Sequence, residues 1–415
     1  THYANEGEDH GRLFRGLFEG VARNVHALYD RVKVDGPVLL VGHGALIGPL
    51  ARRFEELAGV PVTVPPEAGV FEALGALREA AAQAGHAAWP DDPAALLRPS
   101  RRTVRALEPA AQGPGAVVHL EREGRTIDPS EPLVLGLDLG STGSKAALVA
   151  VDGAVAADVY RRTDGNPVEA AKALVAEIRE MCPNPVVAVG LTGSGRDAAA
   201  TVVRAAFPDL GPRLTVENEI VAHATAARLL DPDGGRSLSI VEIGGQDAKF
   251  INVQDGRILE SDMNRVCSAG TGSFLEEQAL AHGLDDIAEF GEIAARGTRP
   301  PDLGQTCTVF VADVAAEALA QGFTREDIFA GLQYSVIRNH KHRVMGQRRF
   351  LDRVFFQGKP ATNPSLARTL AAVTGREVWV PPDPGAMGAI GIAQLAAAAV
   401  PEMAEHGAVA GSNEG

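Results

Sequence analysis

The chain has 415 residues, of which 45% are hydrophobic and 22% are charged, and its formal net charge is −14. This length fits about three domains, and the composition is that of a globular protein with a sizeable core. The acidic balance argues against a general nucleic-acid or anionic-membrane binder. No stretch reaches the roughly 18 uninterrupted apolar residues of a membrane span. Three cysteines are too few for a disulfide framework, so we expect a reducing cytoplasm.

Residues 1–86 read as alternating helices and short strands, and their pattern returns 316 residues later. Val38–Ala76 aligns with Val354–Ile392 without a gap, and Gly42 falls on Gly358. A repeat of this length indicates a duplicated structural unit. We therefore expect residues 1–86 to be the C-terminal part of a preceding, incomplete module. The sequence has no initial Met, which suggests a truncated or processed chain.

Residues 87–130 are rich in proline and read as a linker on the surface. The complete module follows, and it contains a second repeat. An apolar strand, a glycine-rich loop, a second strand and an Asp-Gly hairpin turn recur about 104 residues apart, and Asp-Gly between apolar runs is a strong hairpin signal. The sequence thus predicts an α/β fold with two lobes around a cleft, at 131–235 and 236–400, followed by a tail at 401–415.

The two glycine-rich loops have the parts of phosphate-binding loops. The first consists of Asp138, Gly140, Ser141, Thr142, Gly143, Ser144 and Lys145. The opposed loop contains Glu242, Gly244, Gly245, Gln246 and Asp247. The glycines let backbone N–H groups approach an anion, and Asp138 at the strand end can hold Mg²⁺ directly or through water. A triphosphate can be clamped between two such loops, with Gln246 or Asp247 orienting water for in-line attack. Either loop alone could be an ordinary tight hairpin, but their equivalent places in a duplicated fold weaken that alternative.

Three other groups of polar residues are candidates for the cleft or its surroundings. Gly190–Arg196 follows another buried strand and could form a third wall of the cleft. Glu219 and His223 lie at i and i+4 on one helix face, which indicates a packed pair more than a metal site because no third ligand is apparent. His340 and His342 lie in a charged helix and are expected to be solvated.

Two of the three cysteines, Cys267 and Cys307, each precede a helical pattern. A thiol at a helix N-terminus faces unpaired N–H groups and the positive end of the dipole, which favours the thiolate that ligates metal. An iron–sulfur cubane needs about four thiolates, so a two-fold dimer would have to supply the other pair. The simpler alternative is that both are buried small apolar residues. Cys182, at a helix end before proline, is expected to take no part.

Six motifs in this order carry a resemblance to a known family. They are Gly-Leu-Asp-Leu-Gly-Ser-Thr-Gly-Ser-Lys, Thr-Gly-Ser-Gly-Arg, Glu-Ile-Val-Ala-His-Ala, Ile-Gly-Gly-Gln-Asp-Ala-Lys, Cys-Ser-Ala-Gly-Thr-Gly-Ser-Phe-Leu-Glu and Cys-Thr-Val-Phe. Over about 131–398 the chain resembles the ATP-dependent activases of 2-hydroxyacyl-CoA dehydratases and benzoyl-CoA reductases, in their two-module form. These proteins belong to the actin/hexokinase/Hsp70-like (ribonuclease H-like) superfamily, whose duplicated α/β lobes surround a nucleotide cleft.

The resemblance implies an ATPase that uses ATP and Mg²⁺ and forms a homodimer with one [4Fe–4S] cluster at its interface. Cys267 and Cys307 match the family's cysteine positions, and the helices that they begin would change angle when ATP binds. Hydrolysis would drive an electron from ferredoxin or flavodoxin onto a partner, an acyl-CoA dehydratase or a benzoyl-CoA reductase-type enzyme.

Two positions depart from the family pattern. Glu242 stands where these proteins usually carry Asp, and Gly358-Lys359 stands where a Gly-Gly pair usually meets the adenosine. A small-molecule kinase of the same superfamily and a non-catalytic nucleotide-binding scaffold are the alternative functions. The cysteine pair argues against the kinase, and the intact loops argue against the scaffold.

Overall fold

A computed structural model of the chain describes residues 9–32, 36–83, 92, 103–122, 125–164, 166–264, 269–284 and 286–399. The chain divides into two units, Thr1–Arg101 and Arg102–Gly415. No helix of the described part is long and apolar enough to cross a membrane. The expected tail at 401–415 lies outside the described residues.

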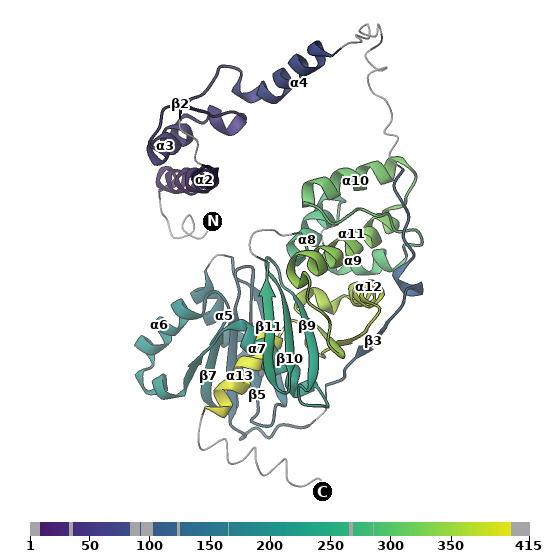
Figure 1. Ribbon diagram of the computed structural model, residues 1–415. Coiled ribbons are helices and arrows are strands. Elements are labelled where there is room, and N and C mark those ends of the chain that lie inside the picture. Colours follow the sequence, from purple (N-terminus) through teal and green to yellow (C-terminus); the bar gives the residue numbers. More distant parts are fainter. Residues whose placement is uncertain are drawn as a thin grey trace. The chain divides into compact units, whose positions relative to one another are not determined.

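The second unit contains two lobes, each built on one mixed sheet (Figure 1). In the first lobe the strand order is β6-β5-β4-β7-β8. Its elements are β4 (Leu133–Leu139), β5 (Gly143–Val149), β6 (Val155–Arg162), α5 (Pro167–Met181), β7 (Val186–Thr192), α6 (Arg196–Ala206), η5 (Pro208–Arg213) and β8 (Leu214–Val216). Helix α5 packs on β5 and β6, and α6 packs on β7 and β8.

In the second lobe the strand order is β11-β10-β9-β12-β13-β3. Its strands are β3 (Ala116–His119), β9 (Ser237–Ile243), β10 (Ala248–Gln254), β11 (Arg257–Met263), β12 (Arg353–Gln357) and β13 (Glu377–Val380). Its helices are η4 (Ala110–Gln112), α8 (Gly272–Ala281), α9 (Ile287–Ala295), α10 (Thr308–Ala320), α11 (Arg325–His340), the π-helical turn η6 (Lys341–Met345), η7 (Lys359–Thr362) and α12 (Pro364–Thr374). Figure 1 shows α8 to α12 gathered on one side of this lobe.

Two inner helices, α7 (Glu219–Leu230) and α13 (Met387–Ala398), pack against each other. Helix α13 also packs on β4, β5 and β7 of the first sheet, where Val134, Val149 and Ala393 share one buried cluster. Helix α7 packs on the second sheet, where Ala227 lies in a buried cluster with Phe355. The helix pair therefore joins the two lobes through apolar contacts on the inner face of each sheet.

The strand–loop–strand–hairpin repeat predicted from the sequence is confirmed. In each lobe the first strand pairs antiparallel with the second and the second with the third, as β4-β5-β6 and as β9-β10-β11. The first strand of each trio then pairs parallel with the next strand along the sheet, β7 or β12. The duplicated ladders place the two glycine-rich loops at corresponding corners of the two lobes.

The proline-rich stretch before β4 differs from the expected surface linker. Strand β3 pairs parallel with β13 and so extends the second sheet by one edge strand. Arg368 of α12 donates hydrogen bonds to the carbonyls of Ala110, Gly113, Pro114 and Gly115, which ties this stretch to the helix. The carbonyl groups of a loop need such donors when they leave water, so residues 103–122 form part of the second lobe.

The first unit repeats most elements of the closing part of the second unit. It comprises α2 (His10–Val32), β1 (Val38–Leu39), η1 (His43–Leu46), α3 (Gly48–Ala58), β2 (Val62–Thr63), η2 (Ala68–Val70) and α4 (Phe71–Ala82). The parallel pair β1-β2 has the register of β12-β13, shifted by 316 residues. Gly42 and Gly358 have φ of 93° and 94°, and Gly59 and Gly375 have φ of 66° and 67°. Helix α4 corresponds to α13, yet it has no buried residue, whereas most of α13 is buried.

Candidate functional site

The two glycine-rich loops lie opposite each other at the mouth of the cleft between the lobes. A Cβ atom added at Gly245 would lie 2.8 Å from the Cβ of Thr142, so the loops are in van der Waals contact. A cavity of about 510 Å³ opens beside them. One part of it is lined by the two loops and their carboxylates, and another by apolar side chains of α8, α9 and α12, among them Leu275, Phe290 and Leu366. The site thus combines a charged region rich in backbone N–H groups with an apolar region.

Each lobe contributes an acid–lysine pair to this cavity. Lys145 lies opposite Asp138 in the β4-β5 ladder, and its Nζ lies 3.2 Å from Asp138 Oδ2. Lys249 lies opposite Glu242 in the β9-β10 ladder, and its Nζ lies 2.9 Å from Glu242 Oε2. Asp138 and Glu242 are 104 residues apart in the sequence, and so are Lys145 and Lys249. The duplication therefore extends to the charged side chains.

Lys249 is the central cation of the second lobe's half of the site. Its side chain is 2% exposed, and its Nζ also lies 3.1 Å from Asp247 Oδ2 and 3.5 Å from Glu219 Oε2. Burial lowers the pKa of Lys249, but the carboxylates outweigh burial and hold that pKa above its usual value. Burial also raises the pKa values of Glu242 and Glu219, against the opposing effect of Lys249. The ammonium group holds these acidic side chains together.

Asp138 is 4% exposed at the end of β4. Burial raises its pKa, but the nearby ammonium groups, above all that of Lys145, outweigh this effect and hold the pKa below its usual value. A Cβ atom on Gly388 would lie 2.7 Å from Asp138 Oδ2 and 3.3 Å from His223 Nε2, so only glycine fits there. Asp138 is therefore kept ionised beside the first turn of α13.

His223 faces the same cavity from α7 and is neutral in this setting. Burial lowers its pKa, and the Lys249 charge lowers it further. Its Nδ1 lies 2.7 Å from Gln357 Oε1, a carbonyl oxygen, so Nδ1 carries the proton and Nε2 has a free lone pair. Sequence reasoning took Glu219 and His223 for a packed pair, and the structure places both on the cavity wall.

Most residues selected from the sequence line the cavity. Among them are Asp138, Gly140, Ser141, Thr142, Gly143, Lys145, Glu242, Gly244, Gly245, Gln246, Asp247 and Lys359, together with Ser194 of the expected third wall. Ser144 lies behind the loop, where its hydroxyl is 2.8 Å from that of Thr163. Gly358 supports the end of β9, because a Cβ there would lie 2.0 Å from the Ile243 carbonyl oxygen. Lys249 was missed, although its displacement of 104 residues from Lys145 could have revealed it.

Gly270 and Thr306, which are near the two candidate ligand cysteines in the sequence, both lie against Asn339 near the end of α11. Cys307 is exposed at the N-cap of α10, as predicted, whereas Cys267 lies outside the described residues. Asn339 donates a hydrogen bond from Nδ2 to the Thr306 carbonyl, 3.5 Å away. A Cβ on Gly270, three residues after Cys267, would lie 3.4 Å from the Asn339 Cβ. No group of three or more His, Cys, Asp or Glu placed to hold a metal ion occurs among the described residues.

Cys182 and His340 occupy buried positions outside the cavity. Cys182 is buried among first-lobe residues, and its Sγ donates to Asn184 Oδ1 at 3.2 Å. His340 was expected to be solvated, but it is 2% exposed and its Nε2 lies 3.1 Å from the Lys249 carbonyl oxygen. Its position on α11, which packs through most of its length into the core of the second lobe, explains the difference. His342, two residues later in η6, is exposed as expected.

His340 should make the protein less stable in mild acid. Burial lowers its pKa from the usual 6.5 to about 4. The unfolded chain therefore binds a proton more readily than the folded chain, and stability falls as pH drops from 6.5 towards 4. By linkage the loss should reach roughly 2 kcal/mol at pH 5. Urea denaturation of His340→Gln at pH 7 and pH 5 should show a smaller loss than wild type, whereas His342→Gln should match wild type. An unchanged pH dependence in His340→Gln would contradict the assignment.

Comparisons with known proteins agree with this geometry. A model of the BadF/BadG/BcrA/BcrD ATPase family matches residues 135–396. The chain is 34% identical over 273 residues to the activator of lactoyl-CoA dehydratase of Anaerotignum propionicum, covering 63% of this chain and 96% of that protein. It is 29% identical over 270 residues to the (R)-2-hydroxyglutaryl-CoA dehydratase activating ATPase of Acidaminococcus fermentans, with coverages of 63% and 96%.

Two solved structures share the fold. Component A of the Acidaminococcus fermentans (R)-2-hydroxyglutaryl-CoA dehydratase is similar with a TM-score of 0.57 and 25% identity, over 64% of this chain and 97% of that one. The Clostridium difficile activator of 2-hydroxyisocaproyl-CoA dehydratase, solved with bound ADPNP, has a TM-score of 0.54 and 26% identity, over 68% and 98%. These findings confirm the expected actin/hexokinase/Hsp70-like fold and the resemblance to dehydratase activators. The chain belongs to the BadF/BadG/BcrA/BcrD ATPase family.

Proposed function

We propose that this chain is an ATP-hydrolysing activator that transfers an electron to an acyl-CoA dehydratase or a benzoyl-CoA reductase-type enzyme. The observation that carries the proposal is the cavity between two matched glycine-rich loops. The hydroxyl oxygen of Thr142 is buried between these loops and has no hydrogen-bond partner among the described residues. A buried hydroxyl without a hydrogen-bond partner costs free energy of folding. A phosphate oxygen in the cavity would accept a hydrogen bond from it. The bound ADPNP in the Clostridium difficile relative supports the same ligand class.

The cavity residues can be assigned roles in hydrolysis. Asp138, ionised at the strand end, would hold Mg²⁺ directly or through water, since Mg²⁺ at nucleotide sites uses one or two carboxylates together with phosphate oxygens. Lys145, backbone N–H groups of the first loop and the N–H of Gly245 would bind the phosphates. Gln246 or Asp247 would orient the attacking water, and Lys249 fixes the Asp247 carboxylate through its 3.1 Å contact. The apolar region beside Phe290 and Lys359 would receive the adenosine.

The cysteines form the second part of the proposal. Cys267 and Cys307, from each of two copies of the chain, would ligate one [4Fe–4S] cluster, which supplies one-electron chemistry when bound. The exposed thiol of Cys307 at a helix N-terminus suits a thiolate ligand. Beside it Val309 is 64% and Phe310 is 62% exposed, so apolar surface is available for the second copy. Ferredoxin or flavodoxin would be the electron donor, in the reducing cytoplasm where free thiols persist.

Nucleotide binding and the cysteine helices are connected through the backbone. Gly272 and Ser273, which begin α8, donate backbone hydrogen bonds to the carbonyls of Gly244 and Gly245, each at 2.8 Å. A change in the second loop on phosphate binding would therefore be transmitted directly to α8, five residues after Cys267. Such coupling needs contacts that differ between two arrangements of the site, and these two hydrogen bonds are candidates for that difference.

The cysteine assignment predicts that iron and the dimer are lost together. Protein purified without oxygen should contain about four irons per dimer and a brown chromophore. Cys267→Ser and Cys307→Ser should each lose the iron and run as monomers in sedimentation, while ATP binding persists because the cleft is intact. Cys182→Ser, whose thiol is buried among first-lobe residues, is the matched control and should keep both.

Two outcomes would contradict the assignment. Iron that survives Cys307→Ser and disappears in Cys182→Ser would place the ligands elsewhere. Wild-type protein that contains no iron but phosphorylates a small molecule would favour a kinase of the same superfamily.

A further inference from the structure

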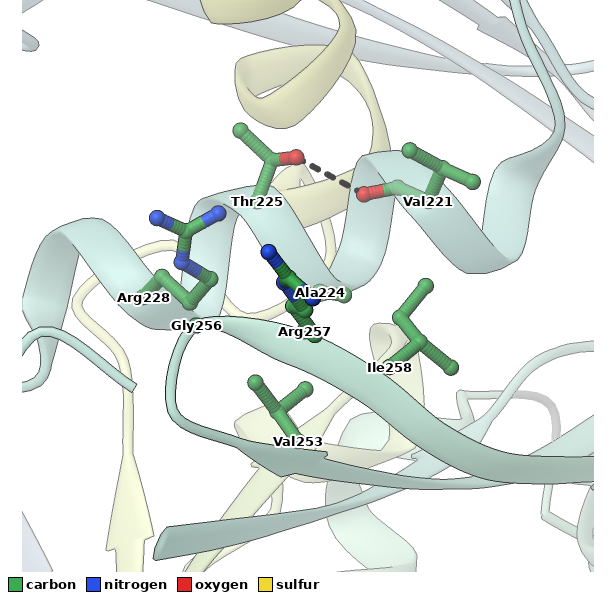
Figure 2. Close-up of a pocket in the computed structure, with 8 residues that line it drawn as sticks. All are labelled: Val221, Ala224, Thr225, Arg228, Val253, Gly256, Arg257 and Ile258. Atoms are coloured by element: carbon green, nitrogen blue, oxygen red, sulfur yellow. Dashed lines mark hydrogen bonds between the residues drawn. The ribbon is translucent and has the colours of Figure 1, made fainter. Parts of the chain in front are cut away.

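A second pocket lies between α7 and the β10-β11 hairpin, away from the nucleotide cavity (Figure 2). Its volume is about 250 Å³, and it shares no lining residue with the nucleotide cavity. It is lined by Val221, Ala224, Thr225, Arg228, Val253, Gly256, Arg257 and Ile258. Figure 2 shows Arg228 projecting from the helix and Arg257 from the start of β11, with Val253 and Ile258 on the side of Arg257. The proposed nucleotide chemistry uses none of these residues.

The position of Arg228 is set by two glycine turns. A Cβ on Gly235 would lie 2.7 Å from the Arg228 Cγ, and one on Gly256 would lie 3.4 Å from its Nη2. Both glycines have positive φ, 87° and 73°, and the Gly256 N–H donates to the Gly235 carbonyl at 2.9 Å. Because these glycines carry no side chains, the aliphatic part of the Arg228 side chain packs against the backbone of the two turns. Arg228 therefore loses less conformational entropy when it binds an anion.

Neither guanidinium is neutralised within the described part of the chain. Arg228 and Arg257 have no ion pair or side-chain hydrogen bond there, although the chain contains 53 acidic and 39 basic residues. The nearby Asp231 and Asp233 are both engaged by Arg353. Asp255, in the same turn as Gly256, forms no ion pair with either arginine within the described part of the chain. Two guanidinium groups, each with five N–H donors, therefore flank one pocket in an acidic protein.

The remaining lining is apolar. Val221, Ala224, Val253 and Ile258 supply aliphatic surface. The one hydroxyl, on Thr225, already donates to the Val221 carbonyl at 2.9 Å, as the dashed line in Figure 2 marks. The pocket thus offers two guanidinium groups and an aliphatic wall. The Thr225 hydroxyl proton is already donated to the Val221 carbonyl. A ligand that matches it has an anionic head and an apolar body.

We propose that this pocket binds a small phosphomonoester, with its phosphate dianion between Arg228 and Arg257 and its apolar group against the aliphatic wall. The guanidinium fork matches two phosphate oxygens at once, and two such groups match a dianion better than a monoanion. Because the residues differ from those of the cleft, the site would be filled while nucleotide is bound.

Calorimetric titration of the full chain with phenyl phosphate, at saturating ADP so that the cleft is already occupied, tests the proposal. We expect saturable binding that is weakened about tenfold or more by Arg228→Ala and by Arg257→Ala, as is typical when a hydrogen bond to a charged group is removed. Arg236→Ala is the matched control, because Arg236 is an exposed arginine next to the same turn but outside the pocket lining. Inorganic phosphate should bind at least about tenfold more weakly than phenyl phosphate, because it buries no apolar surface.

Several results would overturn the proposal. These are the absence of saturable binding, equal weakening by Arg236→Ala and Arg228→Ala, and equal affinity for inorganic phosphate and phenyl phosphate. Binding of a glutamate-rich peptide with the same arginine dependence, without binding of phenyl phosphate, would instead assign the pocket to an acidic protein partner. Loss of ATP hydrolysis in Asp138→Ala leaves this titration interpretable, since the two sites share no residue.

Discussion

Lys249→Met should lower the free energy of unfolding by about 3–5 kcal/mol at pH 7, the usual cost of leaving buried charges without their partner. The Lys249 ammonium lies within 3.5 Å of three carboxylates, from Glu219, Glu242 and Asp247. Without it, these acids would repel one another in a site where the Glu242 side chain is 5% exposed. Urea denaturation followed by circular dichroism measures the loss.

The pH dependence of this loss identifies its cause. The pKa values of Glu219 and Glu242 are already raised by burial, and Lys249 opposes that rise. In Lys249→Met both values should rise further. The folded variant would then bind more protons than the unfolded chain, and its stability should recover as pH falls. Lys172→Met, which removes an exposed ion pair with Glu169, should change stability by less than about 1 kcal/mol. A loss that is equal at pH 5 and pH 8 would contradict the electrostatic explanation.

The repeats could be predicted from sequence because they depend on glycine positions and strand lengths. Strand β4, Leu133–Leu139, is the apolar strand predicted before the first glycine-rich loop, since a run of apolar residues ends at that loop. The repeat displaced by 316 residues was recognisable because Gly42 and Gly358 occupy the same backbone conformation, which only glycine adopts without strain. These signals are local in the chain, and tertiary packing did not override them.

The edge strand β3 could not be predicted because its signal is short and its partner is distant. Its four residues, Ala116–His119, follow a proline-rich stretch that by composition reads as a loop. They form a strand only because β13 offers an unpaired edge more than 250 residues later in the chain. His340 was placed wrongly for a related reason. The charged residues around it suggested solvent, whereas the packing of α11 buries it.

The site residues that belong to the two glycine-rich loops could be predicted from the sequence. Those that a helix contributes could be predicted less well. Glu219 and His223 reach the cavity because α7 packs between the lobes, and the i, i+4 spacing alone does not say what that helix face meets. Lys249 follows its loop by two residues, and alternation along β10 turns it towards Glu242. The duplicated positions of Lys145 and Lys249 were a sequence signal for its role.

Asp138→Ala should reduce Mg²⁺-dependent ATP hydrolysis by about 10²–10³-fold, the range typical when one group that stabilises the transition state is removed. Asp138 is the buried, ionised carboxylate at the centre of the first lobe's half of the site. Its loss would remove the proposed Mg²⁺ ligand and leave Lys145 without its 3.2 Å partner. Steady-state phosphate release at saturating ATP and Mg²⁺ measures the effect, and thermal melting verifies that the fold survives.

Asp138→Asn separates charge from shape in this experiment. The amide keeps the size of the side chain beside Gly388, where an added Cβ would already lie within 2.7 Å of Asp138 Oδ2, but it removes the negative charge. Hydrolysis should fall nearly as far as in Asp138→Ala if the carboxylate acts through its charge, and raising Mg²⁺ should restore part of it because weaker metal binding is then the defect. Asp158→Asn, on β6 of the same lobe and paired with Arg122 outside the cavity, is the matched control and should hydrolyse ATP at the wild-type rate. Wild-type turnover in both Asp138 variants would rule out this cleft as the site of hydrolysis.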